Sequence, residues 1–395
     1  MTATGTVSRR VGFAVAVVAS TLMMAAASAP SPFYPDLEAR FDATPAAMTA
    51  VFAIYAVVLL GALLTAGSLS DHVGRRPVLS AGFVLLAVSV VAFGHAGSVA
   101  GLLVARSLQG LASGVLLSAL AATITELEPA HRRGSGAVWN SVAPLVGLAV
   151  GATVGGAALT VTPARAMGEV FGALGVAYAV LAAAVWVAPE TSPRHEGWRT
   201  ALRPHLALPR SGVRTFWVGV PALLAGWANG GLYLSLGAGI VASEFGVRSH
   251  LWQGGVVGLL SAGAAAAAFL VRGLPARTAS IVGMTGVAAG AALALVAIGG
   301  GSLPVYLLSV VVAGTGFGAS FTGVLRSVAS SVGAHERAGV FASVYTVSYL
   351  SFGLPAVAAG LLVPVLSLGT TASWYAGAVV LLALTAVVLR VRSAL

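Results

Sequence analysis

The sequence predicts an all-α integral membrane protein whose twelve transmembrane helices form two pseudo-symmetric six-helix bundles. Its composition is the first reason: 58% of the 395 residues are hydrophobic and 8% are charged, whereas soluble domains carry about 25% charged residues. The mean hydropathy of +0.96 is too high for a chain surrounded only by water. The other two reasons are a series of long apolar runs and the placement of arginine.

The apolar runs are bounded by proline, glycine or arginine, and each is long enough to cross roughly 30 Å of hydrocarbon as a helix. They are continuous, whereas barrel strands alternate apolar and polar residues over about ten positions. In chain order, the runs cover residues 11–29, 46–66, 79–96, 100–124, 135–160, 168–188, 214–240, 250–270, 278–299, 303–327, 338–362 and 372–391.

Arginine supplies all 21 basic residues, and the formal net charge is +10. With the N-terminus placed inside, every arginine falls on the inner side except Arg40, Arg165 and Arg248, which lie outside, and Arg106, which lies within a run. Cytoplasmic loops of membrane proteins are enriched in arginine, so both termini are expected in the cytoplasm. The basic charge therefore indicates topology in the cytoplasmic membrane, and no nucleic-acid partner is expected.

Cysteine is absent and the seven histidines are scattered, so we expect no disulfide, no metal site and no bound cofactor. Residues 1–29 are similar to a secretory signal, because Arg9 and Arg10 precede an apolar stretch that ends in small residues. We expect this segment to be retained as the first helix. Its removal would leave eleven spans and invert the arginine distribution.

A polar stretch over residues 189–213 predicts a cytoplasmic linker between one bundle over residues 1–188 and a second over residues 214–395. Many transporters contain such internal repeats, and the two halves match at an offset of 204 residues. The matched pairs are Gly110 and Gly314, Gly114 and Gly318, His131 and His335, Arg133 and Arg337, and Gly156 and Gly360.

The loop between the second and third runs follows the pattern G-x-L-x-D-x-x-G-R-R over residues 67–76. Gly67 and Gly74 allow a tight turn, and Asp71 can meet a helix N-terminus or an arginine of the neighbouring half. Arg75 and Arg76 are suited to anchor the inner membrane interface.

This loop resembles the signature of the major facilitator superfamily, and the chain is similar to that family over its whole length. The resemblance implies a twelve-helix transporter that works by alternating access. It also implies that the loop is a latch between the two halves, with Asp71 and Arg75 in that role. The second half keeps only a remnant over residues 272–277 without an acid, so the latch is expected to be mostly one-sided.

The fourth run contains Arg106 and Gln109, which are three residues apart and therefore share a helix face. Gly110 and Gly114 follow as a stripe for close helix packing. A guanidinium within the membrane is costly unless it is paired or faces water, or snorkels to the outer headgroups. The residues resemble the R-x-x-Q-G motif of the family, which implies a cavity position with a role in coupling or substrate binding.

The fifth run carries a ladder of four glycines suited to close helix packing. The ladder resembles the antiporter motif G-x-x-x-G-P-x-x-G-G of the family. Ala152 stands where that motif has proline, which puts the implied antiport in doubt. The glycines are Gly147, Gly151, Gly155 and Gly156.

Polar residues within other runs are candidates for the substrate cavity, with helix packing or interface anchoring as the alternative for each. They are Asn229 and Tyr233, four residues apart on the seventh run, together with Asn140 and Tyr345. Family architecture places the first, fourth, seventh and tenth spans around the cavity and the second, fifth, eighth and eleventh beside it.

No acidic residue falls at the centre of a run. Proton carriers are therefore sought at Asp36, near the outer mouth of the cavity, and at Glu126, at the inner end of the fourth run. A cavity without a central acid is suited to a neutral or anionic, largely apolar substrate.

Together these features predict a monomeric secondary active transporter that uses the proton gradient to export a drug-like or metabolite molecule across the cytoplasmic membrane. The alternative is a proton-coupled importer of a sugar or organic acid. A membrane enzyme or a non-transporting sensor would need a catalytic cluster or an added soluble domain, and the sequence contains neither.

Overall fold

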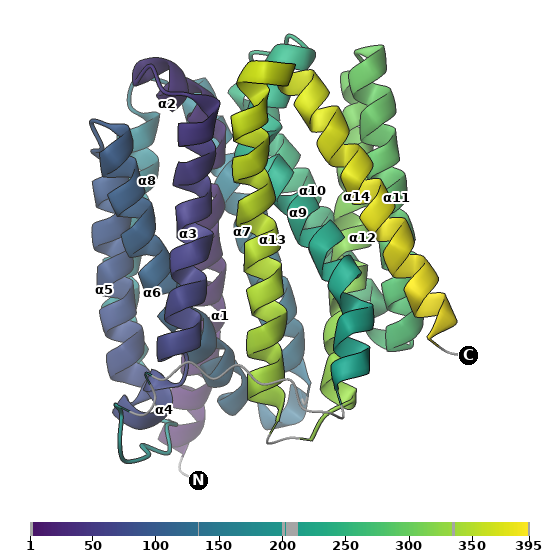
Figure 1. Ribbon diagram of the computed structural model, residues 1–395. Coiled ribbons are helices and arrows are strands. Elements are labelled where there is room, and N and C mark those ends of the chain that lie inside the picture. Colours follow the sequence, from purple (N-terminus) through teal and green to yellow (C-terminus); the bar gives the residue numbers. More distant parts are fainter. Residues whose placement is uncertain (1–2, 133, 200–201, 203–211, 334–335, 394–395) are drawn as a thin grey trace.

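The computed structural model describes residues 3–132, 134–199, 202, 212–333 and 336–393. Every regular element within these ranges is a helix, and the long helices stand side by side (Figure 1). The short helices α2 (Tyr34–Arg40) and α4 (Leu69–Val73) lie at opposite ends of the molecule. The long helices are α1 (Ala3–Ser28), α3 (Pro45–Ala66), α5 (Arg75–Gly94), α6 (Val99–Glu126), α7 (Ser135–Val161), α8 (Ala166–Ala184), α9 (Val213–Glu244), α10 (His250–Leu270), α11 (Ala276–Gly300), α12 (Leu303–Ser330), α13 (Arg337–Leu366) and α14 (Leu368–Arg392).

Among the described residues, eleven helical segments are long and apolar enough to cross a membrane. Helix α9 is as long as the others but is not one of the eleven. Its mean hydropathy is lowered by Pro221, Asn229 and several glycines within its 32 residues. The chain is thus a multi-pass membrane protein.

Each apolar run predicted from the sequence overlaps one long helix, but several boundaries were wrong. Helix α1 begins at Ala3, eight residues before the predicted run, and so includes Arg9. Helix α5 begins at Arg75, which the sequence placed in a loop. Hydropathy marks the apolar part of a helix, whereas backbone hydrogen bonds continue until a cap ends them. Within this added part of α1, the Nη2 of Arg9 donates to the carbonyl of Glu126 at 2.7 Å.

Local caps explain where several helices begin. The hydroxyl of Thr44 accepts from the N–H of Ala47 at 3.2 Å, and Pro45 occupies the first helical position of α3. Ser98 caps α6 in the same way. Such side chains satisfy N–H groups that have no partner within the helix. Gly74 precedes α5 with a φ of 121°, a conformation that favours glycine.

The helices pack as two groups. Helices α1, α3, α5, α6, α7 and α8 contact one another in the first group, and α9 to α14 do so in the second. The two groups stand beside each other in Figure 1, and they meet mainly where α10 packs on α7 and α13 packs on α3. The described linker residues 189–199 lie at the end of the molecule that also carries α4, which we call the linker end. The end that carries α2 is called the far end.

Glycines matched by the offset of 204 residues make equivalent contacts in the two groups. Gly110 lies against the backbone of α3, and Gly314 lies against the backbone of α10. Gly156 meets the first turn of α10, and Gly360 meets the first turn of α3. Small residues allow such close approach of helix backbones. Arg133 and His335 of the matched pairs lie outside the described residues.

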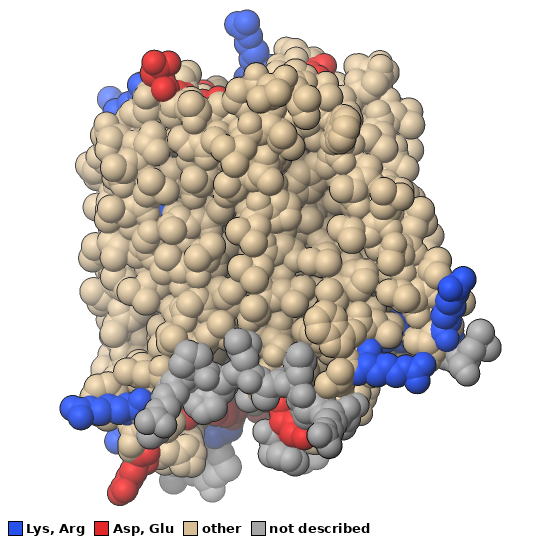
Figure 2. Space-filling model, in the orientation of Figure 1, with Lys and Arg blue, Asp and Glu red and all other residues tan. Residues whose placement is uncertain are grey.

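Charged side chains gather at the two ends of the molecule. In the face shown in Figure 2, arginine and acidic side chains border a broad band of uncharged residues. Large apolar side chains on the long helices are also exposed, among them Val84, Val88, Leu308 and Leu381. Because hydrocarbon cannot solvate charge, the band is the surface that faces lipid.

Candidate functional site

A cavity of about 310 Å³ lies between the two helix groups. Its walls come from α1, α3, α6 and α7 on one side and from α9, α10, α12 and α13 on the other. Toward the linker end, the lining extends to Asn140 of α7, Ala268 of α10, Leu325 of α12 and Tyr345 of α13. Both groups therefore contribute to one central space that extends toward the linker end.

At the far end the two groups are in close contact. A Cβ atom at Gly254 would clash with the carbonyl oxygen of Ala152, because α7 and α10 touch through their backbones there. The hydroxyl of Ser31 donates to the carbonyl of Leu234 across the same boundary at 2.6 Å. We refer to these contacts as the far-end seal.

Aromatic side chains of the second group form one wall of the cavity. Trp227 lies at its centre, with ring centroids 5.8 Å from Phe317, 5.5 Å from Phe321, 5.2 Å from Tyr349 and 5.7 Å from Phe352. Such spacings are typical of favourable edge-to-face and offset ring pairs. We call these five residues the aromatic wall.

Arg106 lies on the opposite side of the cavity, on α6, and its side chain is 0% exposed. Its Nη1 donates to Oε1 of Gln109 at 2.7 Å and to the carbonyl of Ala27 at 3.4 Å. Its Cζ lies 4.4 Å from the centroid of the Tyr55 ring, in range of a cation–π contact. Nε and Nη2 of Arg106 have no hydrogen-bond partner, which leaves two donors of a buried cation unused.

A second cluster of charged residues lies at the linker end, within the loop predicted as a latch. Arg75 contacts Asp71 at 2.5 Å and Glu126 at 2.7 Å, and its Nε also donates to Glu126 at 3.2 Å. The hydroxyl of Thr191 donates to the same carboxylate at 2.5 Å. These contacts join the loop, the end of α6 and the start of the linker, all on the side of the first helix group.

Glu190 completes this cluster, although the sequence gave no reason to select it. Its carboxylate accepts from the backbone N–H groups of Arg75 at 2.8 Å, Arg76 at 3.2 Å and Ser192 at 3.0 Å. Burial acts to raise the pKa of Glu190, but these N–H donors outweigh burial and hold the pKa below its usual value. The carboxylate thus caps the N-terminus of α5, where a negative charge is favoured.

A sequence profile of the major facilitator superfamily matches residues 16–356. The chain belongs to this superfamily. Within it, an uncharacterized MFS-type transporter of Mycobacterium tuberculosis (strain ATCC 25618 / H37Rv) is 30% identical over 148 residues, which cover 37% of this chain and 24% of that protein. The matched stretch thus spans about a quarter of the length of that relative.

Solved structures of other transporters share the fold. A D-xylose–proton symporter has a TM-score of 0.75 at 19% identity and covers 95% of this chain and 96% of its own. A bacterial homolog of the human lysosomal transporter Spinster, in an inward-facing and unoccupied conformation, has a TM-score of 0.73 at 16% identity, with coverage of 98% and 95%. A nucleoside transporter has a TM-score of 0.71 at 12% identity, with coverage of 96% and 99%. Membership of this superfamily indicates a transporter and not an enzyme.

Of the residues that the sequence predicted for the substrate cavity of this superfamily member, most line the cavity and one does not. Arg106, Asn140, Asn229 and Tyr345 line the cavity. Tyr233 does not, because its ring is 1% exposed and packs 6.0 Å from the ring of Tyr306 inside the second helix group. The eight helices that line the cavity are those expected from the order of the spans.

The remaining polar candidates lie behind or beyond the cavity wall. Gln109 is buried, with Nε2 donating to the carbonyl of Ala26 at 2.8 Å, and it holds Arg106 in place. Glu126 pairs with Arg75 instead of facing the cavity. Asp36 is exposed on α2 at the far end. None of these three residues is part of the cavity lining.

The glycine ladder of α7 serves two neighbours. Cβ atoms at Gly147, Gly151 and Gly155 would meet the carbonyl oxygens of α1, whereas one at Gly156 would meet the backbone of α10. Ala152, which replaces the proline of the family motif, contributes the carbonyl that faces Gly254 in the far-end seal. The ladder therefore holds α7 against both helix groups.

Sequence reasoning missed most of the aromatic wall. Phe317, Phe321 and Phe352 look like ordinary apolar residues of their runs, and only their convergence on Trp227 gives them a shared role. The signal that could have found them is the four-residue spacing of Phe317 and Phe321, which places both rings on one helix face.

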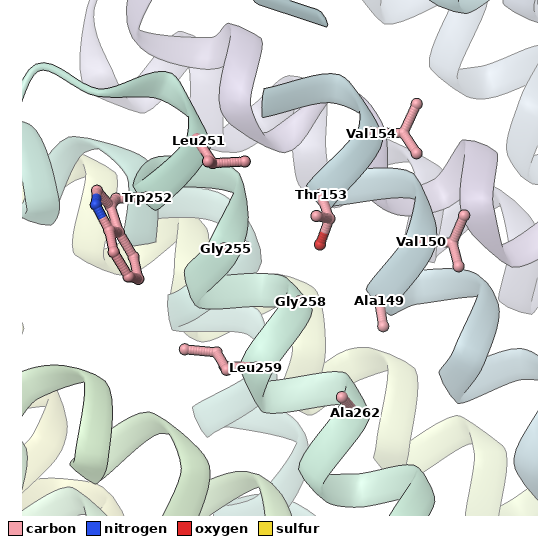
Figure 3. Close-up of a pocket in the computed structure, with 10 residues that line it drawn as sticks. All are labelled: Ala149, Val150, Thr153, Val154, Leu251, Trp252, Gly255, Gly258, Leu259 and Ala262. Atoms are coloured by element: carbon pink, nitrogen blue, oxygen red, sulfur yellow. The ribbon is translucent and has the colours of Figure 1, made fainter. Parts of the chain in front are cut away.

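A separate groove of about 490 Å³ runs along the outer side of the boundary between α7 and α10 (Figure 3). Val150 and Val154 project from α7, and Leu251, Trp252 and Leu259 project from α10. Thr153 supplies the hydroxyl group seen there. Its lining includes the exposed apolar side chains of Val150, Val154, Leu251 and Trp252, and it is separate from the central cavity.

Proposed function

We propose that this chain is a secondary active transporter that exports a largely apolar small molecule across the cytoplasmic membrane in exchange for protons. The observation that carries the proposal is a cavity between the two helix groups, which is sealed at the far end and extends toward the linker end. A site at such a boundary can be exposed to either side by rocking one group against the other.

The distribution of arginine between the two ends of the molecule supports an orientation of the chain in the membrane. We propose twelve crossings, with α9 as the seventh, and both termini in the cytoplasm. The far end carries Arg40, Arg165 and Arg248, while most other arginines flank the linker end. Because arginine is enriched in cytoplasmic loops, the linker end is the cytoplasmic end. The cavity would then receive its substrate from the cytoplasm, as an exporter requires.

The composition of the cavity supports an amphipathic substrate over a sugar. The aromatic wall offers large apolar surfaces, whereas sugars need many fixed polar partners. The importer remains the second candidate because the D-xylose–proton symporter shares the fold. The direction of transport decides between the two.

Coupling to protons would act through the linker end, because none of the eleven acidic residues lines the cavity. We propose Glu126 as the proton acceptor in preference to Asp36. A proton on Glu126 would weaken its paired contacts to Arg75 and so loosen the loop that is expected to act as a latch. No bound cofactor is required, since the proton gradient supplies the energy.

The test uses the full chain reconstituted in liposomes, with a panel of neutral, anionic and cationic aromatic compounds and an imposed pH gradient. Compounds should move against their gradients when the compartment that represents the outside is acidic, and a protonophore should stop this movement. Asp71→Asn should slow the flux without abolishing substrate binding. Flux that is indifferent to the pH gradient would refute proton coupling, and accumulation toward the linker end would favour the importer.

A further inference from the structure

Most of the polar atoms left without hydrogen-bond partners around the cavity are N–H donors, and the hydroxyl of Tyr55, which also lacks a partner, can donate as well as accept. Nε and Nη2 of Arg106 and Nε1 of Trp227 are buried and lack a hydrogen-bond partner, as does Nδ2 of Asn229. Arginine and indole N–H groups can only donate hydrogen bonds. Buried donors without acceptors are costly, so the cavity is suited to a ligand that supplies acceptors.

Arg106 also lacks a negative partner. All eleven acidic residues of the chain are described, and none of them lines the cavity or pairs with Arg106. Gln109 and the carbonyl of Ala27 satisfy one nitrogen only. An uncompensated cation at membrane depth is expensive, and the Tyr55 ring offsets only part of that cost.

The geometry points to an aromatic carboxylate as the ligand of this cavity, with its oxygens on Arg106 and its ring against the aromatic wall. The inference rests on the proposed transport function and names its substrate class. Guanidinium groups bind carboxylates through two parallel N–H donors, and two such donors are free here. In addition to the two N–H donors of Arg106, the indole N–H of Trp227 is a free donor, and it lies in the aromatic wall that would hold the ring of the ligand.

The size of the space fits a molecule of one or two rings. Its volume of about 310 Å³ is at the lower end of the range of roughly 300–1,000 Å³ found for small-molecule sites. A cationic ring compound would meet Arg106 as a like charge, and a neutral one would leave the charge of Arg106 uncompensated. Arg106 therefore favours a ligand with a negative charge, and the aromatic wall favours a ligand with a flat ring.

Three probes with the same ring test the assignment by calorimetric titration of the detergent-purified full chain: 2-naphthoate, 2-naphthamide and 2-naphthylmethylammonium. We expect 2-naphthoate to bind about tenfold or more tightly than the amide, as charge-assisted hydrogen bonds predict. The ammonium compound should bind most weakly. Equal affinities for the three probes, or no binding by any of them, would overturn the inference without the use of a variant.

Substitutions of Arg106 test whether this residue is the source of the preference for naphthoate over the amide. Arg106→Gln should reduce the preference for naphthoate over the amide to less than about threefold, while Arg106→Lys should retain part of it, because lysine keeps the charge but not the fork of donors. Arg277→Gln is the matched control, since Arg277 binds the carbonyls of Arg390 and Val391 on α14, away from the cavity. An unchanged preference in Arg106→Gln would refute the site, and gel filtration confirms that each variant is folded.

Liposome flux of the same probes separates this inference from the proposed function. Gradient-driven flux of the ammonium compound or the amide, with no preference for naphthoate, would overturn the aromatic carboxylate and leave the transporter intact. Preferential naphthoate binding that depends on Arg106 but is never followed by flux would support the site and overturn the transport proposal.

Discussion

Arg75 shows how one side chain can hold three segments together. It contacts Asp71 in the loop and Glu126 at the end of α6, and its backbone N–H donates to Glu190 of the linker. Its side chain is 7% exposed and that of Glu126 is 31% exposed. The pair is thus partly in water, and its rupture should cost less than the roughly 3–5 kcal/mol of a fully buried pair.

Arg75→Gln should therefore lower the stability of the purified protein by about 1–3 kcal/mol, seen as a lower thermal unfolding midpoint in detergent. Arg392→Gln is the control, because Arg392 is an exposed arginine at the C-terminal end of α14. Equal midpoints for the two variants would contradict the role assigned to Arg75.

The carboxylate of Glu190 should make the stability of the folded protein depend on pH. Its pKa is held below the ordinary value for glutamate, so the folded state favours the charged form. This stabilisation is present above the unfolded pKa and is lost as the pH falls through the folded pKa. Glu190→Gln should be less stable than the wild type at pH 7, and the difference should shrink as the pH falls below the ordinary pKa of glutamate and vanish below the lowered pKa of Glu190. Thermal unfolding across this range measures the effect.

Glu196→Gln provides the comparison for this series, because Glu196 is exposed on the linker. It should match the wild type at each pH. A constant destabilisation of Glu190→Gln from pH 7 to below the lowered pKa of Glu190 would show that its carboxylate does not act through its charge.

At the scale of elements, α7 and α10 form the closest contact between the two helix groups, which the proposed transport cycle requires to open and close. Their contact at Gly254 and Gly156 leaves no space for a side chain. A bulky residue there can be accommodated only if the two helices separate. Such a substitution therefore shifts the equilibrium between a closed and an open far end and need not disturb either helix by itself. The same contact is repeated, by symmetry, where Gly360 of α13 meets α3.

Gly254→Val should accordingly open the far-end seal. The chain lacks cysteine, so a single cysteine at Ser31, placed in the seal, reports access. A membrane-impermeant maleimide added at the far end should label Ser31→Cys faster in the Gly254→Val background. Gly377→Val is the matched control, since Gly377 of α14 has open space around it. Equal labelling rates in the two backgrounds would contradict the seal.

At the scale of the whole molecule, orientation is the property that the proposed function needs most. Arg248 lies between α9 and α10 at the far end, and Ser393 follows α14 at the linker end. In intact cells an impermeant thiol reagent should label Arg248→Cys, whereas Ser393→Cys should react only after the membrane is permeabilised. The reverse pattern would refute the assignment of the linker end to the cytoplasm.

Much of the fold was predictable because lipid selects for apolar helices of sufficient length. Every apolar run corresponds to a long helix, including α9, whose Asn229 and Pro221 lower its hydropathy. Helix ends were less predictable, since hydropathy does not register caps such as Gly74 or the bond from Arg9 to the end of α6.

The cavity was predictable only in part. Asn229 and Tyr233 share a helix face by spacing, yet only Asn229 lines the cavity. Tyr233 lies one turn closer to the far end, where the same face of α9 packs against Tyr306. In a membrane bundle the core and the lipid-facing surface are both apolar, so periodicity cannot tell which neighbour a face will meet.

By itself, the sequence determined the membrane-spanning helical architecture, the likeness of the loop over residues 67–76 to its family and the isolation of Arg106 from any nearby acid along the chain. The helical architecture and the isolation of Arg106 follow from solvation, which can be evaluated residue by residue, and the loop is found by its pattern of residues. Only the tertiary structure brought Trp227, Phe317 and Phe352 together opposite Arg106 and paired Glu126 with Arg75. Those relations depend on how helices distant in sequence pack, and packing is a property of neighbours that no local pattern contains.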